Sequence, residues 1–259
     1  MKNTRRRTGS GGFWDRPGVM HMIADLLTFA ATIALGYAAV VAALRLPFFP
    51  LREVVVATPI RQVTEAQLEY AARRSVLGNF FTVDLESVRQ AFEKLPWVRR
   101  AQVRRLWPNG IELAIEEHVA VAAWGQGEGD SRFVNAQGEV FAATGAAVLP
   151  RLAGPEGSSA EVLKRYQEFA QTLAAVDRKP QSVMLSSRLA WQVQLDDGLL
   201  IELGRDQPKS PVGERLRRLV SVHSDVAARL PFSAAVIDLR YPNGFAVRAA
   251  GNRTESKSK

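Results

Sequence analysis

Apolar residues first gather near the N-terminus, in a run without a charged side chain. The run extends from Leu26 to Leu44 and reads LLTFAATIALGYAAVVAAL. A helix rises about 1.5 Å per residue, so a helix over this run crosses roughly 30 Å, the thickness of the hydrocarbon layer of a membrane. The pattern therefore predicts one transmembrane helix, which we place at residues 26–46.

The charges on either side of this run predict its orientation. Residues 1–25 carry five Lys and Arg residues against two aspartates, whereas residues 45–52, which follow the run, carry only Arg45 and Arg52. By the positive-inside rule, the N-terminus lies in the cytoplasm and the remaining chain on the far side. A cleaved signal peptide is one alternative, but its apolar core is usually about 7–15 residues long. A buried helix of a soluble domain is the other, and it rarely has so long an uncharged run.

Residues 47–124 show, in order, the periods of strand, helix, helix, strand and strand. The five predicted elements are residues 51–56, 64–74, 85–95, 101–107 and 111–115. The first helix begins with a capping box formed by Thr64 and Gln67, and Asp84 can cap the second. The two final strands are joined by a short turn.

The turn between those strands has a predictable length. Matching the apolar faces of the two strands places Trp107 opposite Ile111, which leaves residues 108–110 as a three-residue loop. Such loops place a glycine in the left-handed region, so we expect Gly110 to have a positive φ. Residues 242–244 repeat this Pro-Asn-Gly sequence, and the same expectation applies to Gly244.

The other face of this hairpin carries Arg100 and Arg104, near Glu112 and Glu116. One interpretation is a solvated face with weak cross-strand ion pairs. The other is a contact surface for an acidic partner. Arg100 and Arg104 are therefore candidates for a second contact surface.

Residues 125–250 contain short strands and two helices, after a Gly-rich break at 125–131 and around a turn-rich connector at 149–157. The predicted elements are a hairpin over 132–142, a helix that begins with the capping box Ser158 and Glu161, strands at 191–195 and 199–203, a helix from Ser210, and a hairpin of 236–241 and 245–249. The first helix has one apolar face, formed by Val162, Tyr166, Phe169, Leu173 and Val176, and the strands at 191–195 and 199–203 are joined by a turn that ends at Gly198. We expect the charged tail, residues 251–259, to be disordered.

Composition and chemistry narrow the possible functions. The chain has a net charge of +8 and no cysteine, which excludes disulfides and thiolate metal sites. The three histidines, His21, His118 and His223, are too far apart in sequence for the usual HxxxH metal spacing. We find no nucleophile elbow and no phosphate-binding loop. We therefore predict a protein that is not an enzyme, with no cofactor and no bound metal.

Five stretches resemble the FtsQ/DivIB family of bacterial cell-division proteins. They are FPLREVVV, NFFTVDLESVRQAFEK, LPWVRRAQVRRLWPNGIELAIEE, LPRLAGPEG and VIDLRYPNGFAV, and they occur in the family's order along the chain. The resemblance implies an α+β fold: one transmembrane helix, then a POTRA domain (β-α-α-β-β) and a mixed β domain with packed helices. The implied divisions are a cytoplasmic tail (1–25), the transmembrane helix (26–46), the POTRA domain (47–124), the β domain (125–250) and the tail (251–259).

The resemblance also implies a function and partners. Proteins of this family are non-enzymatic scaffolds of the inner membrane at the division septum. They bind the coiled-coil proteins FtsB and FtsL, and they help to control septal peptidoglycan synthesis. An alternative function for this chain is a POTRA-type chaperone or transport component for envelope proteins. Transporters of that type attach their POTRA modules to a long series of barrel strands, which the region after residue 124 does not show.

The candidate partner site lies at the end of the folded region. The strand that begins at Phe245 is the last one predicted, so we expect it at a sheet edge, where a partner can add a strand. The candidate residues in and beside it are Arg240, Tyr241, Asn243, Gly244, Phe245, Ala246, Val247 and Arg248, with Arg188 as a further charge. Of these, Arg188, Arg240, Tyr241, Asn243 and Gly244 match family positions that the resemblance implies for FtsB binding. Packing of Tyr241 against Phe245 is the alternative role for this tyrosine.

Overall fold

The computed structural model describes residues 17–45, 50–127, 131–145, 148–229, 234–241 and 244–249. Within these ranges the chain forms two compact units. The first comprises Met1–Pro59, Glu65–Phe92 and Ala101–Ala114, and the second comprises Ile60–Thr64, Glu93–Arg100 and Ile115–Lys259. The tails at 1–16 and 251–259, including the predicted disordered tail, lie outside the described residues.

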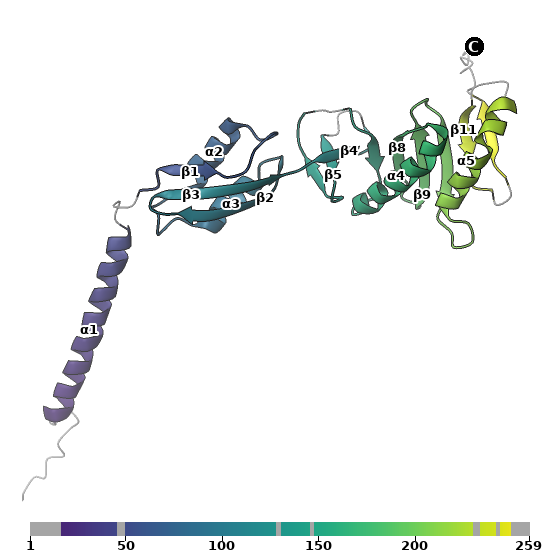
Figure 1. The fold of residues 1–259 in the computed structure, drawn as a ribbon. Coiled ribbons are helices and arrows are strands. Elements are labelled where there is room, and N and C mark those ends of the chain that lie inside the picture. The colour runs from purple at the N-terminus through teal and green to yellow at the C-terminus, as the bar shows by residue number, and fades with distance from the viewer. Residues whose placement is uncertain are drawn as a thin grey trace, which may run out of the picture. The chain divides into compact units, whose positions relative to one another are not determined.

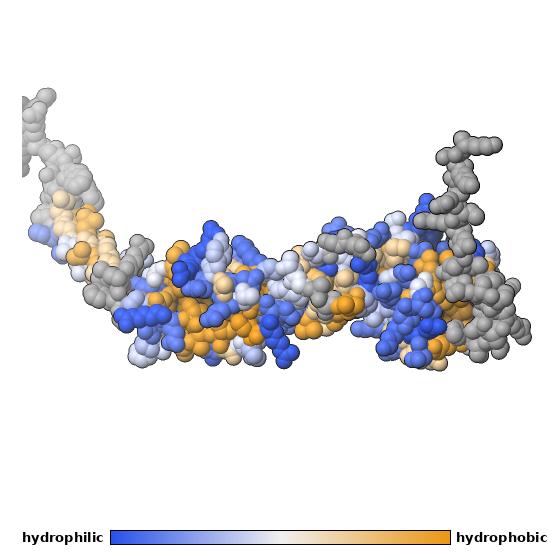
Figure 2. Space-filling model, turned by 90° about the horizontal axis from the view of Figure 1, so that it is seen from above, coloured by the Kyte–Doolittle hydropathy of each residue, from blue (hydrophilic) through white to orange (hydrophobic). Residues whose placement is uncertain are grey.

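Helix α1, Pro17–Arg45, contains the predicted membrane segment (Figure 1). Gly18–Leu44 is long and apolar enough to cross a membrane, and it is the one helix of that kind in the described part of the chain. Its surface is largely apolar in the space-filling view (Figure 2). Thr28 and Thr32 donate their hydroxyls to the carbonyls of Ala24 and Thr28 one turn earlier, at 2.7 and 2.8 Å. These hydroxyls are therefore satisfied without water, as a span requires.

A three-stranded sheet and two helices, which lie mostly in the first unit, have the predicted strand, helix, helix, strand, strand order. The elements are β1 (Glu53–Val56), α2 (Glu65–Ser75), α3 (Leu85–Glu93), β2 (Val98–Leu106) and β3 (Gly110–Glu117). The sheet order is β1-β3-β2, and β1 runs parallel to β3. Asp84 caps α3 as predicted, because its Oδ1 accepts the N–H groups of Glu86 and Ser87. Val88 and Phe92 then face the core and are almost fully buried.

The prediction for the turn between β2 and β3 was wrong in detail. Strand β2 ends at Leu106, and Trp107 lies in the turn with 79% of its surface exposed. Gly110 is already the first residue of β3 and faces Leu106, and its φ is not in the left-handed region. The turn comprises residues 107–109, and β3 begins at Gly110, so the reversal is complete before the glycine.

The second unit is built on a nine-stranded sheet. Its strands are β4 (Ala120–Trp124), β5 (Arg132–Asn135), β6 (Val140–Ala142), β7 (Arg151–Ala153), β8 (Pro180–Leu185), β9 (Ala190–Leu195), β10 (Leu200–Arg205), β11 (Ala234–Asp238) and β12 (Ala246–Ala249). The order across the sheet is β12-β11-β10-β9-β8-β7-β4-β5-β6. Strand β4 pairs with β5 and β7, so residues 120–124 belong to this sheet and not to the three-stranded one.

Two helices pack beside each other on this sheet, α4 (Ser159–Leu173) over β7 and β8, and α5 (Val212–Arg229) over β10 (Figure 1). A 3-10 turn, Ala174–Val176, extends α4. The predicted apolar face of α4 is confirmed, since Val162 and Phe169 are fully buried. The capping box is not formed: Ser158 donates its hydroxyl to the carbonyl of Pro155 at 2.6 Å instead of accepting from the helix.

Three strands of this sheet were absent from the prediction. No strand was predicted at residues 120–124, where β4 lies. β7 lies inside the stretch interpreted as a connector, and β8 was not predicted at all. Only three residues of β7 are in the ladder, which is too short for a period of two to appear. β7 and β8 join the sheet through parallel pairing, and parallel partners are distant in sequence.

Candidate partner-binding site

Strand β12 lies at one edge of the nine-stranded sheet, drawn in yellow in Figure 1. It pairs with β11 in antiparallel register, with Ala246 opposite Asp238, Val247 opposite Ile237 and Arg248 opposite Val236. Its other side faces no strand among the described residues. The structure therefore presents β12 in the form that strand addition by a partner requires.

Arg240 is held over the neighbouring strands by two carboxylates. Its Nε and Nη2 donate to the two carboxylate oxygens of Asp238 at 2.9 and 2.6 Å, and Nη2 is 3.2 Å from Glu202. These hydrogen bonds lower the pKa of the Asp238 carboxyl and raise that of Arg240. Arg248 extends the cluster, with its Nη2 3.8 Å from Glu202. Both arginine side chains keep more than half of their surface exposed, at 57% and 64%.

Gly204 makes room for Arg240. It has a φ of +74°, and a Cβ atom there would lie 2.8 Å from Cγ of Arg240. The aliphatic part of the arginine therefore lies directly on the backbone at the end of β10. This contact and the Asp238 carboxylate together restrict the arginine to one orientation.

Tyr241 and Phe245 differ in their surroundings. Phe245 is half-buried and packs against the core of the second unit, whereas Tyr241 is 56% exposed. Within the described ranges the two rings form no stacked or edge-to-face pair, and the packing of Tyr241 against Phe245 stays an alternative. Gly244 has open space around its Cα. Asn243 lies outside the described residues, and with it the loop for which we predicted the conformation of Gly244.

Arg188 lies at the same end of the sheet as Tyr241. It is exposed in the turn between β8 and β9, two residues before Ala190, which pairs with Arg205 at the end of β10. Because β10 and β11 run parallel, the end of β10 is level with residues 240–241. The structure thus brings Arg188 to the same sheet end as Tyr241, with strands between them.

The candidate arginines of the β2–β3 hairpin are exposed. Arg104 donates from Nε and Nη2 to the Glu112 carboxylate at 2.8 and 2.7 Å, which is the cross-strand pair that the alternation predicted. This bond raises the pKa of Arg104. Arg100 is exposed. The Glu116 carboxylate, which we expected beside Arg100, instead accepts from Arg99.

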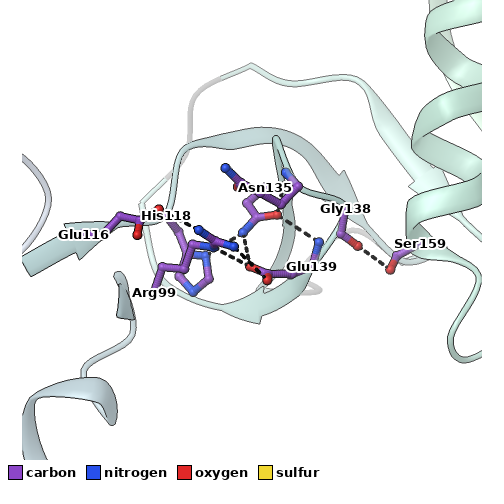
Figure 3. A network of polar contacts seen from close by, with 8 residues as sticks. Arg99, Glu116, His118, Asn135, Gly138, Glu139 and Ser159 are labelled. Carbon is purple, nitrogen blue, oxygen red and sulfur yellow. Dashed lines mark hydrogen bonds and ion pairs between the residues drawn. The ribbon is translucent and has the colours of Figure 1, made fainter. Parts of the chain in front are cut away.

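Arg99 belongs to a polar network that the sequence analysis missed (Figure 3). Its guanidinium bridges two carboxylates: Nε donates to Glu139 at 2.8 Å, and Nη1 to Glu116 at 2.6 Å. The fully buried Asn135 accepts the backbone N–H groups of Gln137 and Glu139, which closes the β5–β6 turn. Hydrogen bonds from Arg99 and Asn135 lower the pKa of Glu139 to about 2. The signal was hard to find because forty positions separate Arg99 from Glu139.

This network also determines which nitrogen of His118 is protonated. The Oδ1 of Asn135 is occupied by two N–H groups, so its Nδ2 points at Nδ1 of His118, 2.9 Å away. An amide nitrogen is a donor, so Nδ1 must accept, and Nε2 carries the proton. The ring stacks on Phe141, with centroids 4.1 Å apart. Burial lowers the pKa of His118, and the neutral ring fits these contacts.

We expect the stability of the chain to decrease as the pH falls from about 7 through about 6.5, the pKa of His118 in the unfolded chain. The unfolded chain binds a proton at this residue with a pKa of about 6.5, while the folded state resists it. The free energy of unfolding therefore falls as the pH drops through the unfolded pKa, and it levels off below the folded one. Glu139 does not change in this range, because its pKa is about 2.

The measurement is denaturant unfolding across that pH range, for the wild type and for His118→Gln. The amide of glutamine does not titrate, so the variant should show a flatter pH dependence. His21 and His223 are present in both proteins and cancel in the comparison. Parallel curves for the two proteins would contradict the assignment.

The side chains at the β12 edge are of types that bind other proteins. In the described part of the chain, no three His, Asp or Glu side chains lie together in a way that could hold a metal ion. The same part has no buried side-chain nitrogen or oxygen without a hydrogen-bond partner. What the second unit offers at β12 is an open strand edge beside oriented cations and an exposed tyrosine, residue types that often anchor interfaces.

Two family models match the chain. The FtsQ-type POTRA domain matches residues 49–118, which contain the three-stranded sheet and its two helices. The C-terminal domain of the cell division protein FtsQ/DivIB matches residues 122–240, which contain the nine-stranded sheet from within β4 to the end of β11.

Curated relatives match over almost the whole length. The cell division protein FtsQ of Nitrosospira multiformis is 40% identical over 91% of this chain and 98% of its own. Those of Burkholderia pseudomallei and Bordetella pertussis are 37% and 34% identical, over 93% and 95% of this chain and 96% and 98% of their own. On this evidence, with the predicted α+β fold confirmed, the chain belongs to the FtsQ/DivIB family of bacterial cell-division proteins.

Proposed function

We propose that this chain is a non-enzymatic scaffold of the division machinery, anchored in the inner membrane by α1. Its N-terminus lies in the cytoplasm and its folded units in the periplasm. There it binds FtsB and FtsL at the septum, links early and late division proteins, and helps to control septal peptidoglycan synthesis.

One observation carries the proposal: β12 is an edge strand flanked by oriented cations. A partner segment that pairs with β12 gains main-chain hydrogen bonds along the strand. Arg240 and Arg248 then meet acidic side chains of that segment, with little loss of side-chain entropy for Arg240 because Asp238 already orients it. Tyr241 adds exposed aromatic surface at the start of the β11–β12 loop. This chemistry fits an acidic partner that can extend into a strand.

The first test replaces residues at this edge. We expect Tyr241→Ala and Arg240→Glu each to weaken binding of purified FtsB to the full chain by at least about tenfold, since such anchors typically dominate an interface. Binding would be measured by biolayer interferometry with the chain in detergent micelles. A thermal melt of each variant reports whether the domain still folds.

Matched controls separate the edge from general surface effects. Tyr70→Ala removes an equally exposed tyrosine from α2, and Arg217→Glu makes the same charge change on the exposed side of α5. Both controls should bind FtsB as the wild type does. If the two edge variants melt normally and bind with unchanged affinity, the site is not at β12.

A further inference from the structure

A groove opens in the first unit between β1 and α2 and has a volume of about 680 Å³. Its floor is apolar and comes from Leu68, Phe92 and Leu113, all at most 8% exposed. Val54 and Val56 of β1 form one wall, and Val54 keeps 36% of its surface exposed. In Figure 1, β1 lies at the side of its sheet next to α2. The helix thus leaves part of the edge strand uncovered.

The backbone of β1 is open on the same side. β1 is the edge strand of the order β1-β3-β2, and the N–H of Ala57 donates to the Leu113 carbonyl at 2.9 Å. Because pairing alternates along a strand, Val55 and Glu53 also face β3, and the backbone groups of Val54 and Val56 point away from it. These groups have no partner among the described residues. The residues that line the groove are therefore the ones with free backbone groups.

Two carboxylates line this groove. Glu65 and Glu69 lie one turn apart on α2, and both are part of its lining. Glu69 shares an ion pair with Arg73 at 2.6 Å, while Glu65 has no ion pair in the described part of the chain. A segment that enters the groove with Lys or Arg side chains at the rim would complement this charge.

The groove is also close to α1 along the chain. Helix α1 ends at Arg45 and β1 begins at Glu53, so residues 46–52 connect them. Even fully extended, this connection reaches no more than roughly 29 Å. The start of β1 therefore lies within that distance of the end of α1.

We propose that the β1–α2 groove binds an extended segment of a second membrane-anchored protein, in which apolar residues alternate with Lys or Arg. The segment adds to β1 as a strand, places apolar side chains over Leu113 and Phe92, and directs its cations to Glu65 and Glu69. This adds a second interaction surface to the proposed function. The proposal rests on that function in one respect only: the partner is taken to be membrane-anchored because α1 anchors this chain in the membrane.

The test uses a fluorescein-labelled heptapeptide of alternating arginine and valine, with the full chain in micelles of an uncharged detergent. Fluorescence anisotropy should show saturable binding. We expect Glu65→Lys and Val54→Pro each to weaken it at least fivefold. Proline at position 54 removes only the outward N–H, so the pairing of β1 with β3 remains. A peptide with N-methyl groups on alternate residues leaves the protein unchanged and should also bind at least fivefold more weakly.

Controls separate this surface from charge alone and from the β12 edge. Glu161→Lys makes the same change in the first turn of α4, where Glu161 is also exposed, and should leave peptide affinity unchanged. Tyr241→Ala should leave it unchanged as well, and Val54→Pro should not alter FtsB binding. The proposal is overturned if Glu161→Lys weakens binding as much as Glu65→Lys does, or if the N-methylated peptide binds as well as the parent. If the wild-type chain binds the peptide but does not bind FtsB, the result counts against the proposed function and not against the groove.

Discussion

Replacing Gly138 by alanine should lower the free energy of unfolding of the second unit by about 3 kcal/mol. Gly138 closes the β5–β6 turn with a φ of +84°, which a residue with a Cβ atom rarely adopts. A Cβ there would also lie only 2.7 Å from the backbone Cα of Ala160 in α4. The turn and the helix would have to move apart.

That movement would also break a hydrogen bond between the turn and the helix. Ser159 donates its hydroxyl to the carbonyl of Gly138 at 2.6 Å, which ties the start of α4 to the β5–β6 turn (Figure 3). The Asn135 and Glu139 contacts lie in the same turn. The substitution thus disturbs a contact that joins two parts of the second unit.

The measurement is guanidinium unfolding of the full chain in micelles, followed by far-UV circular dichroism. Gly198→Ala is the matched control, because Gly198 has a φ of +85° but nothing within 4 Å of its Cβ position. This control isolates the cost of the backbone conformation, about 1 kcal/mol. If the two variants lose the same free energy of unfolding, the close approach to α4 does not contribute to the effect of Gly138→Ala.

Arg215→Met is the second substitution with a large expected effect, a loss of about 3 kcal/mol. Arg215 is only 4% exposed. Its Nη1 donates to the carbonyls of Leu203 and Arg205 at 2.5 and 3.1 Å, and its Nε donates to Ser210. Methionine retains the length of the side chain but leaves both carbonyls without this donor. Buried groups without partners are costly, so the end of β10 should loosen.

This variant should also weaken partner binding at β12. Gly204 lies between Arg215 and Arg240, since its Cβ position is 3.4 Å from Nη1 of Arg215 and 2.8 Å from Cγ of Arg240. A shift at the end of β10 therefore moves the surface on which Arg240 rests. Unfolding curves and FtsB affinities would be measured on the same preparations.

Arg217→Met serves as the control for Arg215→Met. Arg217 is nearby on α5, its side chain is 68% exposed, and it is 4.0 Å from Glu214. Exposed pairs contribute about 0.5 kcal/mol or less, so this variant should unfold and bind almost as the wild type does. A similarly small effect for Arg215→Met would mean that water replaces the guanidinium at both carbonyls.

Features that depend on neighbours in sequence were predicted well. The uncharged run within α1, the Asp84 cap of α3 and the turn at Gly198 each depend on a few adjacent residues. The same holds for the apolar face of α4, whose spacing matches the helical period. Two local predictions were wrong. Ser158 does not cap α4, because its hydroxyl donates to the Pro155 carbonyl, and the β2–β3 turn ends before Gly110, which is the first residue of β3.

The position of the last strand was predicted. It was expected at a sheet edge because it is the last predicted strand before the charged tail, and β12 does lie there. The partners of Arg240 were not predicted, because Glu202 comes from a strand that joins β11 in parallel, and parallel partners are far apart in sequence. The expected role of these residues in binding FtsB stays a prediction.

The sequence by itself determined the membrane helix, the order of elements in the first unit and most helices and hairpins of the second, because these follow from hydrophobic period and turn chemistry within short windows. Only the tertiary structure decided the nine-strand order, the Arg99 network and the groove between β1 and α2. Each of these brings together segments that are distant in the chain. Such contacts depend on how whole elements pack, and no local pattern encodes which distant residues will meet.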